Sequence, residues 1–203
     1  YVETDVLVSL AKLKSHVSGG ITGGMKNLFG IPPSSLYGDD LEHDPNENAT
    51  GYRNGTMHNC TRKPLTAAAF TGKSVEGDHG YNVPRFIVDL NAAFPIQLVV
   101  IDGISVIQTA EGWWNGSMVS VTRPGVLIAG RNAVCTDAVE AAVMGFNPDA
   151  PDRAWPFANG TNYLALARRK GLGENRLSEL EVAGVDLATA RFEFQPTYRR
   201  VAS

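Results

Sequence analysis

The sequence DVLVSLAKLKSHVSGGITGGMKNLFG, residues 5–30, contains the features that decide the fold. Its first part, residues 5–10, has the short apolar pattern of a buried β-strand. A glycine-rich segment with two Gly-Gly pairs follows, and it carries His16 and, ten residues later, Lys26. A strand that leads through such a loop into a helix predicts an α/β fold with its chemistry at the loop.

Two more aliphatic runs, residues 97–102 and 125–129, predict further strands. Runs of this kind suit strands that are buried on both faces, as in a mainly parallel sheet. We therefore expect one α/β domain over residues 1–203, with three layers and a mainly parallel sheet flanked by helices. Helical patterns alternate with the strands at residues 83–93, 133–144 and 162–170, and the expected N-caps of the last two helices are Asn132 and Thr161.

Two segments depart from this alternation. Residues 38–75 are rich in Pro, Gly, Asn and Asp, and they predict a long irregular surface insertion that carries His43, His58 and Cys60. The sequence ELEVAGVDLATARFEF, residues 179–194, predicts a terminal strand pair or an extension at the edge of the sheet.

Composition excludes several classes of function. A formal net charge of −3 over 203 residues argues against nucleic acid as a partner. No apolar run reaches the roughly 20 residues that span a bilayer. Two cysteines, Cys60 and Cys135, are too few for a self-contained iron–sulfur cluster, and their pairing in a disulfide stays open. Five sequons leave open a glycoprotein or simple turn chemistry; they begin at Asn48, Asn54, Asn59, Asn115 and Asn159.

The glycine-rich loop favours binding of a small anionic ligand. Glycines let backbone N–H groups approach a ligand closely, and a helix beginning near Met25 would direct its free N–H groups to the same space. Lys26 would supply a charge or a nucleophilic amine. The other interpretation is that the glycines only make tight turns and that Lys26 is a solvated helix residue. The expected cofactor-binding glycines are Gly19, Gly20, Gly23 and Gly24.

Two acidic residues are further ligand-binding candidates. Asp102 ends an aliphatic strand, and ligands of open α/β sheets lie at the carboxyl ends of strands. Asp137 lies in a helix among small apolar residues, where an unpaired carboxylate would be costly to bury. A helix cap or a backbone hydrogen bond is the alternative role for both.

Five blocks of the sequence resemble, in order, the proteins catalogued as domain of unknown function 362. The resemblance implies a further segment upstream of Tyr1, and it places a functional histidine at His79, which precedes the helix containing Asp-Leu-Asn. Many members carry export leaders, so we expect an extracytoplasmic protein. The blocks are VSLAKLKSHVSGGITGGMKNLFG, HGYNVPRFIVDLNA, LVVIDGI, GVLIAGRNAVCTDAVEAAVMGFNP and YLALARRKGLGENRLSELEVAG.

The loop also resembles that of nickel-pincer lactate racemase. This likeness implies Lys26 as the lysine that holds the organic cofactor, His16 as an acid/base and His79 as a metal ligand. The sequence leaves the cofactor unknown, and the likeness adds a nickel-pincer-type cofactor or another metal as candidates. We expect these three side chains to converge on one concave site.

Two functions follow as hypotheses. The first is an enzyme that acts on a small anionic or carbonyl-bearing substrate through Lys26 and the nearby histidines. The second is a non-catalytic ligand-binding, structural or assembly protein, including a homo-oligomer, that uses the same loop and residues 38–75 for contacts. Electron transfer with a cluster-carrying partner ranks last.

Overall fold

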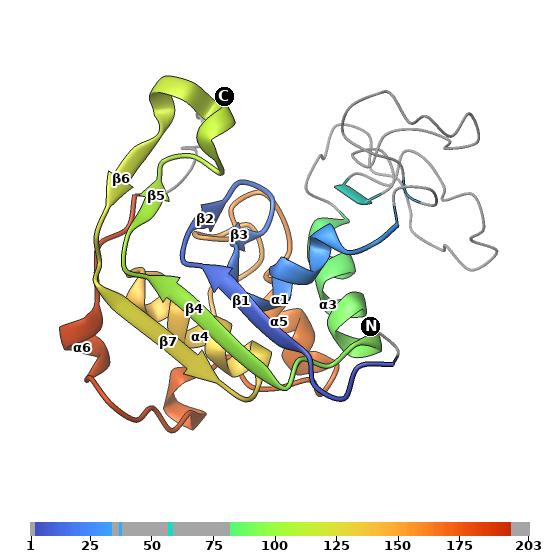
Figure 1. The fold of residues 1–203 in the computed structure, drawn as a ribbon. Helices are drawn as coiled ribbons and strands as arrows, with labels where there is room; N and C mark the ends of the chain where they lie inside the picture. The colour runs from blue at the N-terminus through green and yellow to red at the C-terminus, as the bar shows by residue number, and fades with distance from the viewer. Residues whose placement is uncertain (1–2, 34–36, 38–56, 59–81, 196–203) are drawn as a thin grey trace.

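A three-stranded mixed sheet forms the centre of the computed structural model, which describes residues 3–33, 37, 57–58 and 82–195. The strand order is β1 (Val8–Lys12), β4 (Leu98–Gly103) and β7 (Val126–Gly130). β1 runs parallel to β4, and β7 runs antiparallel to β4 (Figure 1). The α/β prediction is therefore confirmed, with one of the two strand pairs parallel.

The remaining elements surround this sheet. Two short hairpins extend beyond the carboxyl ends of β1 and β4, and the helices lie behind the sheet in Figure 1. The elements, in chain order, are β2 (Ser15–His16), β3 (Gly20–Ile21), α1 (Gly23–Lys26), the 3-10 helix Asn27–Gly30, α3 (Val83–Ala93), β5 (Val106–Gln108), the 3-10 segment Trp113–Met118, β6 (Ser120–Thr122), α4 (Ala133–Val143), α5 (Tyr163–Arg169), the 3-10 helix Leu177–Glu179 and α6 (Leu187–Ala190).

The sheet has one buried and one open face among the described residues. On the inner face Val99 and Ile101 are fully buried against the helices. On the outer face Val8, Leu10 and Leu127 are 43%, 70% and 65% exposed. The strands therefore alternate instead of being buried on both sides, and the second helical layer that we expected is not present in the described part of the chain.

The C-terminal segment differs from its prediction. Residues 179–194 follow directly from the 3-10 helix Leu177–Glu179, and they contain the short helix α6 instead of a strand pair. Their backbone binds the end of α4, because Phe192 N–H donates to Val143 O at 2.7 Å and Phe194 N–H to Met144 O at 3.2 Å. The alternating apolar residues of this segment pack against the end of a helix. A period-2 pattern alone does not distinguish such a segment from a β-strand.

The predicted insertion enters the core at one point. Within residues 38–75 the structure describes only Met57 and His58. Met57 is fully buried in the hydrophobic core, and the His58 carbonyl accepts a hydrogen bond from Asn82 N–H at 2.7 Å. Met57 therefore departs from the surface-excursion prediction, whereas His58 is half-buried. His43, Cys60 and His79 lie outside the described residues.

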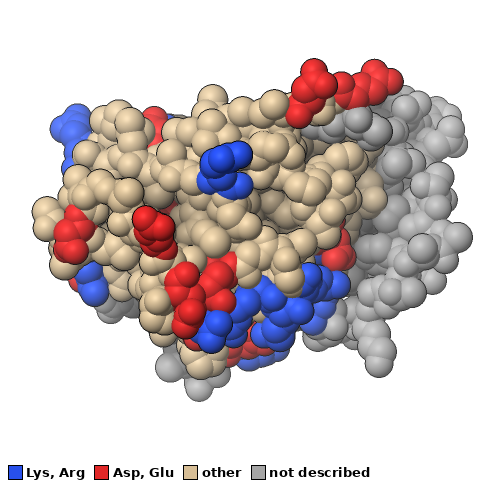
Figure 2. All heavy atoms as spheres, turned by 90° about the horizontal axis from the view of Figure 1, so that it is seen from below, with Lys and Arg blue, Asp and Glu red and all other residues tan. Residues whose placement is uncertain are grey.

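Charges are mixed over the lower face of the molecule. Lysine and arginine side chains lie beside aspartate and glutamate side chains in Figure 2. Arg168, for example, lies 3.5 Å from Asp149 and 3.6 Å from Glu174. Of the helices in the described ranges, none has the length and apolar character needed to cross a membrane.

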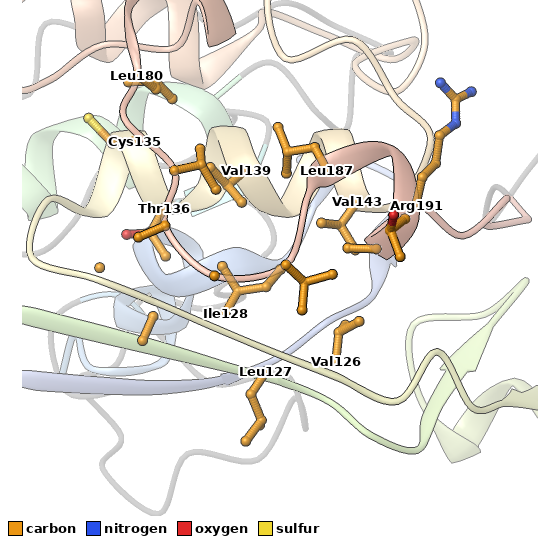
Figure 3. A pocket seen from close by; sticks show the side chains of 18 of the residues that line it. Val126, Leu127, Ile128, Cys135, Thr136, Val139, Val143, Leu180, Leu187 and Arg191 are labelled. Carbon is orange, nitrogen blue, oxygen red and sulfur yellow. The ribbon is translucent and has the colours of Figure 1, made fainter.

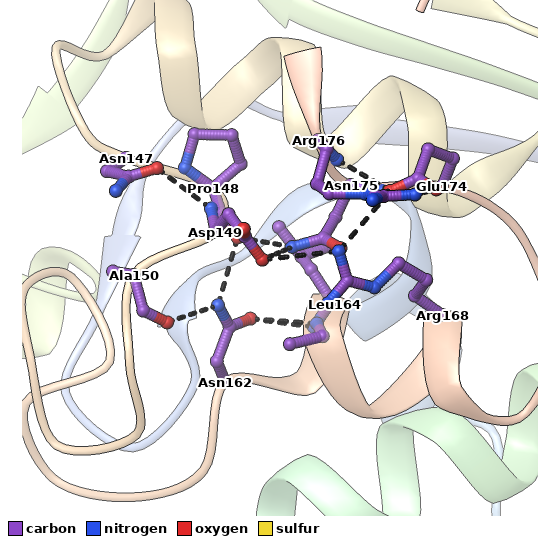
Figure 4. A network of polar contacts seen from close by, with 11 residues as sticks. Asn147, Pro148, Asp149, Ala150, Asn162, Leu164, Arg168, Glu174, Asn175 and Arg176 are labelled. Carbon is purple, nitrogen blue, oxygen red and sulfur yellow. Dashed lines mark hydrogen bonds and ion pairs between the residues drawn. The ribbon is translucent and has the colours of Figure 1, made fainter. Parts of the chain in front are cut away.

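Asn162 is the N-cap of α5, one residue after the cap that we expected. Its side-chain oxygen accepts from Leu164 N–H at 2.9 Å and Ala165 N–H at 3.1 Å. Its amide donates to Pro148 O and Ala150 O at 2.9 and 2.8 Å, which joins the loop after α4 to α5 (Figure 4). Thr161 lacks the amide needed to bind both sides.

We expect Asn162→Ala to lower the free energy of unfolding by about 2 kcal/mol, since it removes a helix cap and leaves buried carbonyl groups without donors. Urea unfolding measures the change. Asn147→Ala is the matched control: Asn147 is exposed and accepts a single hydrogen bond, from Asp149 N–H at 2.9 Å. Equal losses in the two variants would contradict the structural role of Asn162.

Candidate functional site

The first half of the glycine-rich loop is a tight hairpin at the carboxyl end of β1. β2 and β3 pair antiparallel, with Ser15 opposite Ile21 and His16 opposite Gly20. Gly20 has a φ of +81°, and a Cβ there would lie 2.7 Å from the Phe157 ring. Glycine is required at this position because both the backbone and the space forbid a side chain. The hairpin fixes where His16 lies.

The second half of the loop is packed onto α4 and the sheet. Cβ atoms at Gly23 and Gly24 would lie 2.4 Å from the Asp137 carboxylate and 2.3 Å from the Val99 side chain. The N–H groups of Gly24 and Met25 donate to the two oxygens of Asp137, at 2.7 and 3.1 Å. These are the amides that we expected to face a ligand. In the structure they bind an internal carboxylate.

Asp137 is part of a fully buried acidic cluster with Glu140 and Tyr163. The Tyr163 hydroxyl donates to Asp137 Oδ2 at 2.9 Å. Burial raises the pKa of Asp137 to about 7, against the lowering effect of the hydrogen bonds that it accepts. Burial and the charge of Asp137 raise the pKa of Glu140 well above its usual range. Among the described residues, no donor forms a hydrogen bond of good geometry with either Glu140 carboxylate oxygen. The backbone N–H groups of Gly23 and Lys14 are nevertheless near enough to lower the pKa of Glu140.

His16 is a buried neutral imidazole. Its Nδ1 lies 3.1 Å from Glu111 Oε1, 3.1 Å from Ser18 N and 3.2 Å from Gly19 N. Nδ1 donates to Glu111 when it carries a proton and accepts from the two amides when it does not. Burial lowers the pKa of His16 well below its usual value, and the positive charges of Lys26, His58 and Lys14 lower it further. The ring is therefore in the neutral form that can accept a proton, and the lowered pKa makes it a weaker base than a free imidazole.

Lys26 ends α1 beside His16. Its ammonium lies 5.0 Å from the centre of the Phe29 ring. Its aliphatic stem packs against Gly19, where an added Cβ would lie 3.3 Å from Lys26 Cδ. Burial lowers the pKa of Lys26 to about 8; Glu111 opposes this shift and Lys14 adds to it. Near pH 8 about half of these side chains are therefore neutral amines, the form that acts as a nucleophile.

Three residues complete the site, and sequence reasoning missed their roles. Lys14 donates through Nζ to the Glu111 carbonyl at 2.6 Å, and Val17 N–H donates to Glu111 Oε1 at 2.7 Å. His58 packs edge-on against Phe29, with ring centres 5.2 Å apart. The Glu-Gly pair at residues 111–112 was the one available signal for Glu111. His58 had been assigned to the surface insertion, so its burial beside Phe29 was not foreseen.

The predicted site residues separate into three groups. His16 and Lys26 come together with the glycines of the loop. Asp137 lies beneath the loop as its internal partner. Asp102 is elsewhere, since its carboxylate is 40% exposed, accepts from Lys12 Nζ at 2.6 Å and has its pKa lowered by that hydrogen bond. His79 lies outside the described residues, so the convergence of the three side chains on one site stays a prediction.

The described ranges contain no metal-binding group of three or more side chains from histidine, cysteine, aspartate or glutamate. The resemblance implies Lys26 as the lysine that holds the cofactor and His79 as the metal ligand, and His79 lies outside the described residues. The described residues thus do not by themselves provide a pincer-type nickel site, and no chemical step is derived through such a cofactor.

The fold and the loop define an α/β protein with a mixed sheet and a buried lysine–histidine pair beyond the carboxyl end of a parallel strand. The model of the family described as Domain of unknown function (DUF362) matches residues 1–142. The chain belongs to this family, as the ordered sequence blocks predicted. No curated protein and no solved structure matches the chain significantly.

Proposed function

We propose that this chain is an enzyme that acts on a small carbonyl-bearing acid, with Lys26 as its nucleophilic amine. The observation that carries the proposal is the position of the half-buried Lys26 amine, 5.0 Å from the centre of the Phe29 ring and close enough to His16 for its charge to lower the pKa of that ring. Burial lowers the pKa of Lys26 to about 8. An exposed lysine is almost fully protonated at neutral pH and reacts slowly with carbonyl carbon. Burial favours the neutral form of the Lys26 amine, which is the form that attacks carbonyl carbon.

The reaction proposed is reversible imine formation. The Lys26 nitrogen adds to the carbonyl carbon, and the carbon–oxygen double bond becomes a hydroxyl group. His16 carries both protons of the Lys26 amine to the carbonyl oxygen. The first makes the hydroxyl group as the nitrogen adds, and the second converts that group to water, which leaves and gives the imine. Glu111, 3.1 Å from Nδ1 of His16, orients the ring and favours its protonated form during the transfer.

The charge of the site favours an acid as the substrate. Lys14 and Lys26 lie close enough that the charge of each contributes to the pKa of His16. A carboxylate beside them is attracted by both, and it favours the imine nitrogen in its protonated form. The amides of Gly24 and Met25 do not contribute, because Asp137 occupies them.

Reductive trapping tests this function. Protein is incubated with 4-methyl-2-oxopentanoate and sodium cyanoborohydride, which reduces an imine to a stable secondary amine, and peptide mass spectrometry locates the adduct. We expect one adduct, on Lys26, forming faster from pH 6.5 to 8.5 as the amine loses its proton. Lys26→Met keeps the apolar stem and should abolish it.

Lys170→Met is the matched control, because Lys170 is 53% exposed at the end of α5 and lies 4.0 Å from Asp89. This variant should trap as the natural sequence does. Labelling spread over surface lysines, with no preference for Lys26, would contradict the proposal. Circular dichroism of both variants shows whether the fold is retained.

The open sheet face favours a second candidate, a non-catalytic assembly protein. Val8 and Leu10 on β1 and Leu127 on β7 lie exposed on the same face, with β4 between the two strands. Exposed apolar surface of this kind marks interaction sites. Absence of any Lys26 adduct, together with self-association in analytical ultracentrifugation, would support this function over the enzyme.

A further inference from the structure

A cavity of about 290 Å³ lies between the β5–β6 hairpin and the link from β1 to β2. It is at the carboxyl ends of the parallel strands β1 and β4, the edge at which open α/β sheets bind ligands. We infer that this cavity binds the apolar side chain of the substrate, so that the enzyme prefers 2-oxo acids with a branched or aromatic group. The inference rests on the proposed function and names its substrate class.

The cavity shares part of its wall with the reactive site. Lys14 and Glu111 line it, and the same two residues contact or influence His16 and Lys26. Glu111 reaches His16 Nδ1 with its carboxylate and holds Lys14 Nζ with its carbonyl oxygen. A ligand that fills the cavity therefore contacts Lys14 and Glu111, and these two residues in turn interact with His16 and Lys26.

The lining matches an acid with an apolar group. Aliphatic and aromatic side chains form most of the wall, and two lysines stand at one side of it. Lys14 attracts a carboxylate, whereas Lys12 already pairs with Asp102 at 2.6 Å. The apolar wall excludes a charged or strongly polar tail. The wall residues that matter here are Leu13, Val106, Ile107, Trp113 and Val121.

The cavity volume limits the size of the substrate. About 290 Å³ holds about ten water-sized groups, at roughly 30 Å³ for each. This is the lower end of the range for small-molecule pockets. It accommodates a leucine-like or phenylalanine-like side chain and excludes a nucleotide cofactor.

The larger groove of the molecule is a less suitable substrate site. It measures about 1010 Å³ and lies between β7, α4 and the C-terminal segment. Ile128, Val139 and Leu187 line it (Figure 3), and its arginine, Arg191, already donates to Glu193 at 2.9 Å. It shares no lining residue with the smaller cavity or with the loop that carries Lys26.

Side-chain preference in the trapping reaction tests the cavity. Each methylene buried in an apolar site increases binding about fourfold. We therefore expect adducts on Lys26 to form at least tenfold faster from 4-methyl-2-oxopentanoate than from pyruvate, at equal low concentrations. Val121→Trp fills the cavity from a strand position that is 52% exposed. This variant should lose the preference, so that its rates with the two acids differ by less than threefold.

Val182→Trp is the matched control. Val182 is 40% exposed and lines the larger groove, so this variant should keep the preference of the natural sequence. Retention of the preference in Val121→Trp, or its equal loss in Val182→Trp, would overturn the inference.

A binding measurement separates this inference from the proposed function. 4-Methylpentanoate has the acid and the branched group but no carbonyl for Lys26 to attack. If no 2-oxo acid is trapped, calorimetric titration with 4-methylpentanoate still tests the cavity. Binding that Val121→Trp weakens at least tenfold supports the cavity as an acid-binding site without imine chemistry. Undetectable binding to the natural sequence overturns the inference.

Discussion

Replacing Gly23 with alanine will lower the free energy of unfolding by about 3 kcal/mol or more. Gly23 has a φ of +49°, which is unfavourable for any residue with a side chain. The new methyl group would also lie 2.4 Å from the Asp137 carboxylate, which binds the amides of Gly24 and Met25. Relief of the overlap moves the carboxylate and disrupts those hydrogen bonds.

Urea unfolding followed by circular dichroism measures this loss. Gly30→Ala is the control within the same segment, because a Cβ at Gly30 meets no atom within 4 Å. We expect a change there of less than about 0.5 kcal/mol. Similar stabilities for Gly23→Ala and Gly30→Ala would show that Asp137 does not fix the loop.

Replacing Glu140 with glutamine will stabilise the protein at alkaline pH and will have little effect near pH 5. The folded chain holds protons on Asp137 and Glu140 at pH values where the unfolded chain has released them, because burial raises both pKa values. Stability therefore falls as the pH rises above about 4, by up to about 1.4 kcal/mol per pH unit for each proton released. Glutamine resembles the protonated acid and cannot ionise.

We expect Glu140→Gln to be more stable than the natural sequence by about 2 kcal/mol at pH 8, with a shallower dependence on pH. Unfolding in urea at pH 5, 6.5 and 8 measures both quantities. Glu181→Gln changes an exposed glutamate and should follow the natural sequence at every pH. A constant offset of Glu140→Gln at all three pH values would contradict the titration argument.

Local patterns predicted the individual elements well. The helix expected at residues 83–93 is α3 (Val83–Ala93), and the aliphatic run at residues 97–102 is β4 within one residue. These signals depend on neighbours a few positions apart, so a single sequence contains them. The antiparallel partner β7 was correctly expected as a strand. Its direction was not, because direction depends on how the chain returns through the β5–β6 hairpin.

The site was predicted in part, for a related reason. His16 and Lys26 are ten residues apart, and a glycine-rich turn brings them together. Asp137 meets Gly24 across 113 positions, and Lys14 meets the Glu111 carbonyl across 97. The cost of burying an unpaired Asp137 did indicate that it needs partners, but not which ones. No local pattern identifies partners at such separations.

Asp137 also determines how the protein responds to dissolved anions. A short helix that follows a glycine-rich turn would ordinarily attract phosphate or sulfate from the buffer. Here the two amides at that end already bind a carboxylate from within the chain. If the proposed function holds, inorganic anions compete with the substrate at Lys14 and Lys26 instead, and inhibition by phosphate measures how far they occupy that site.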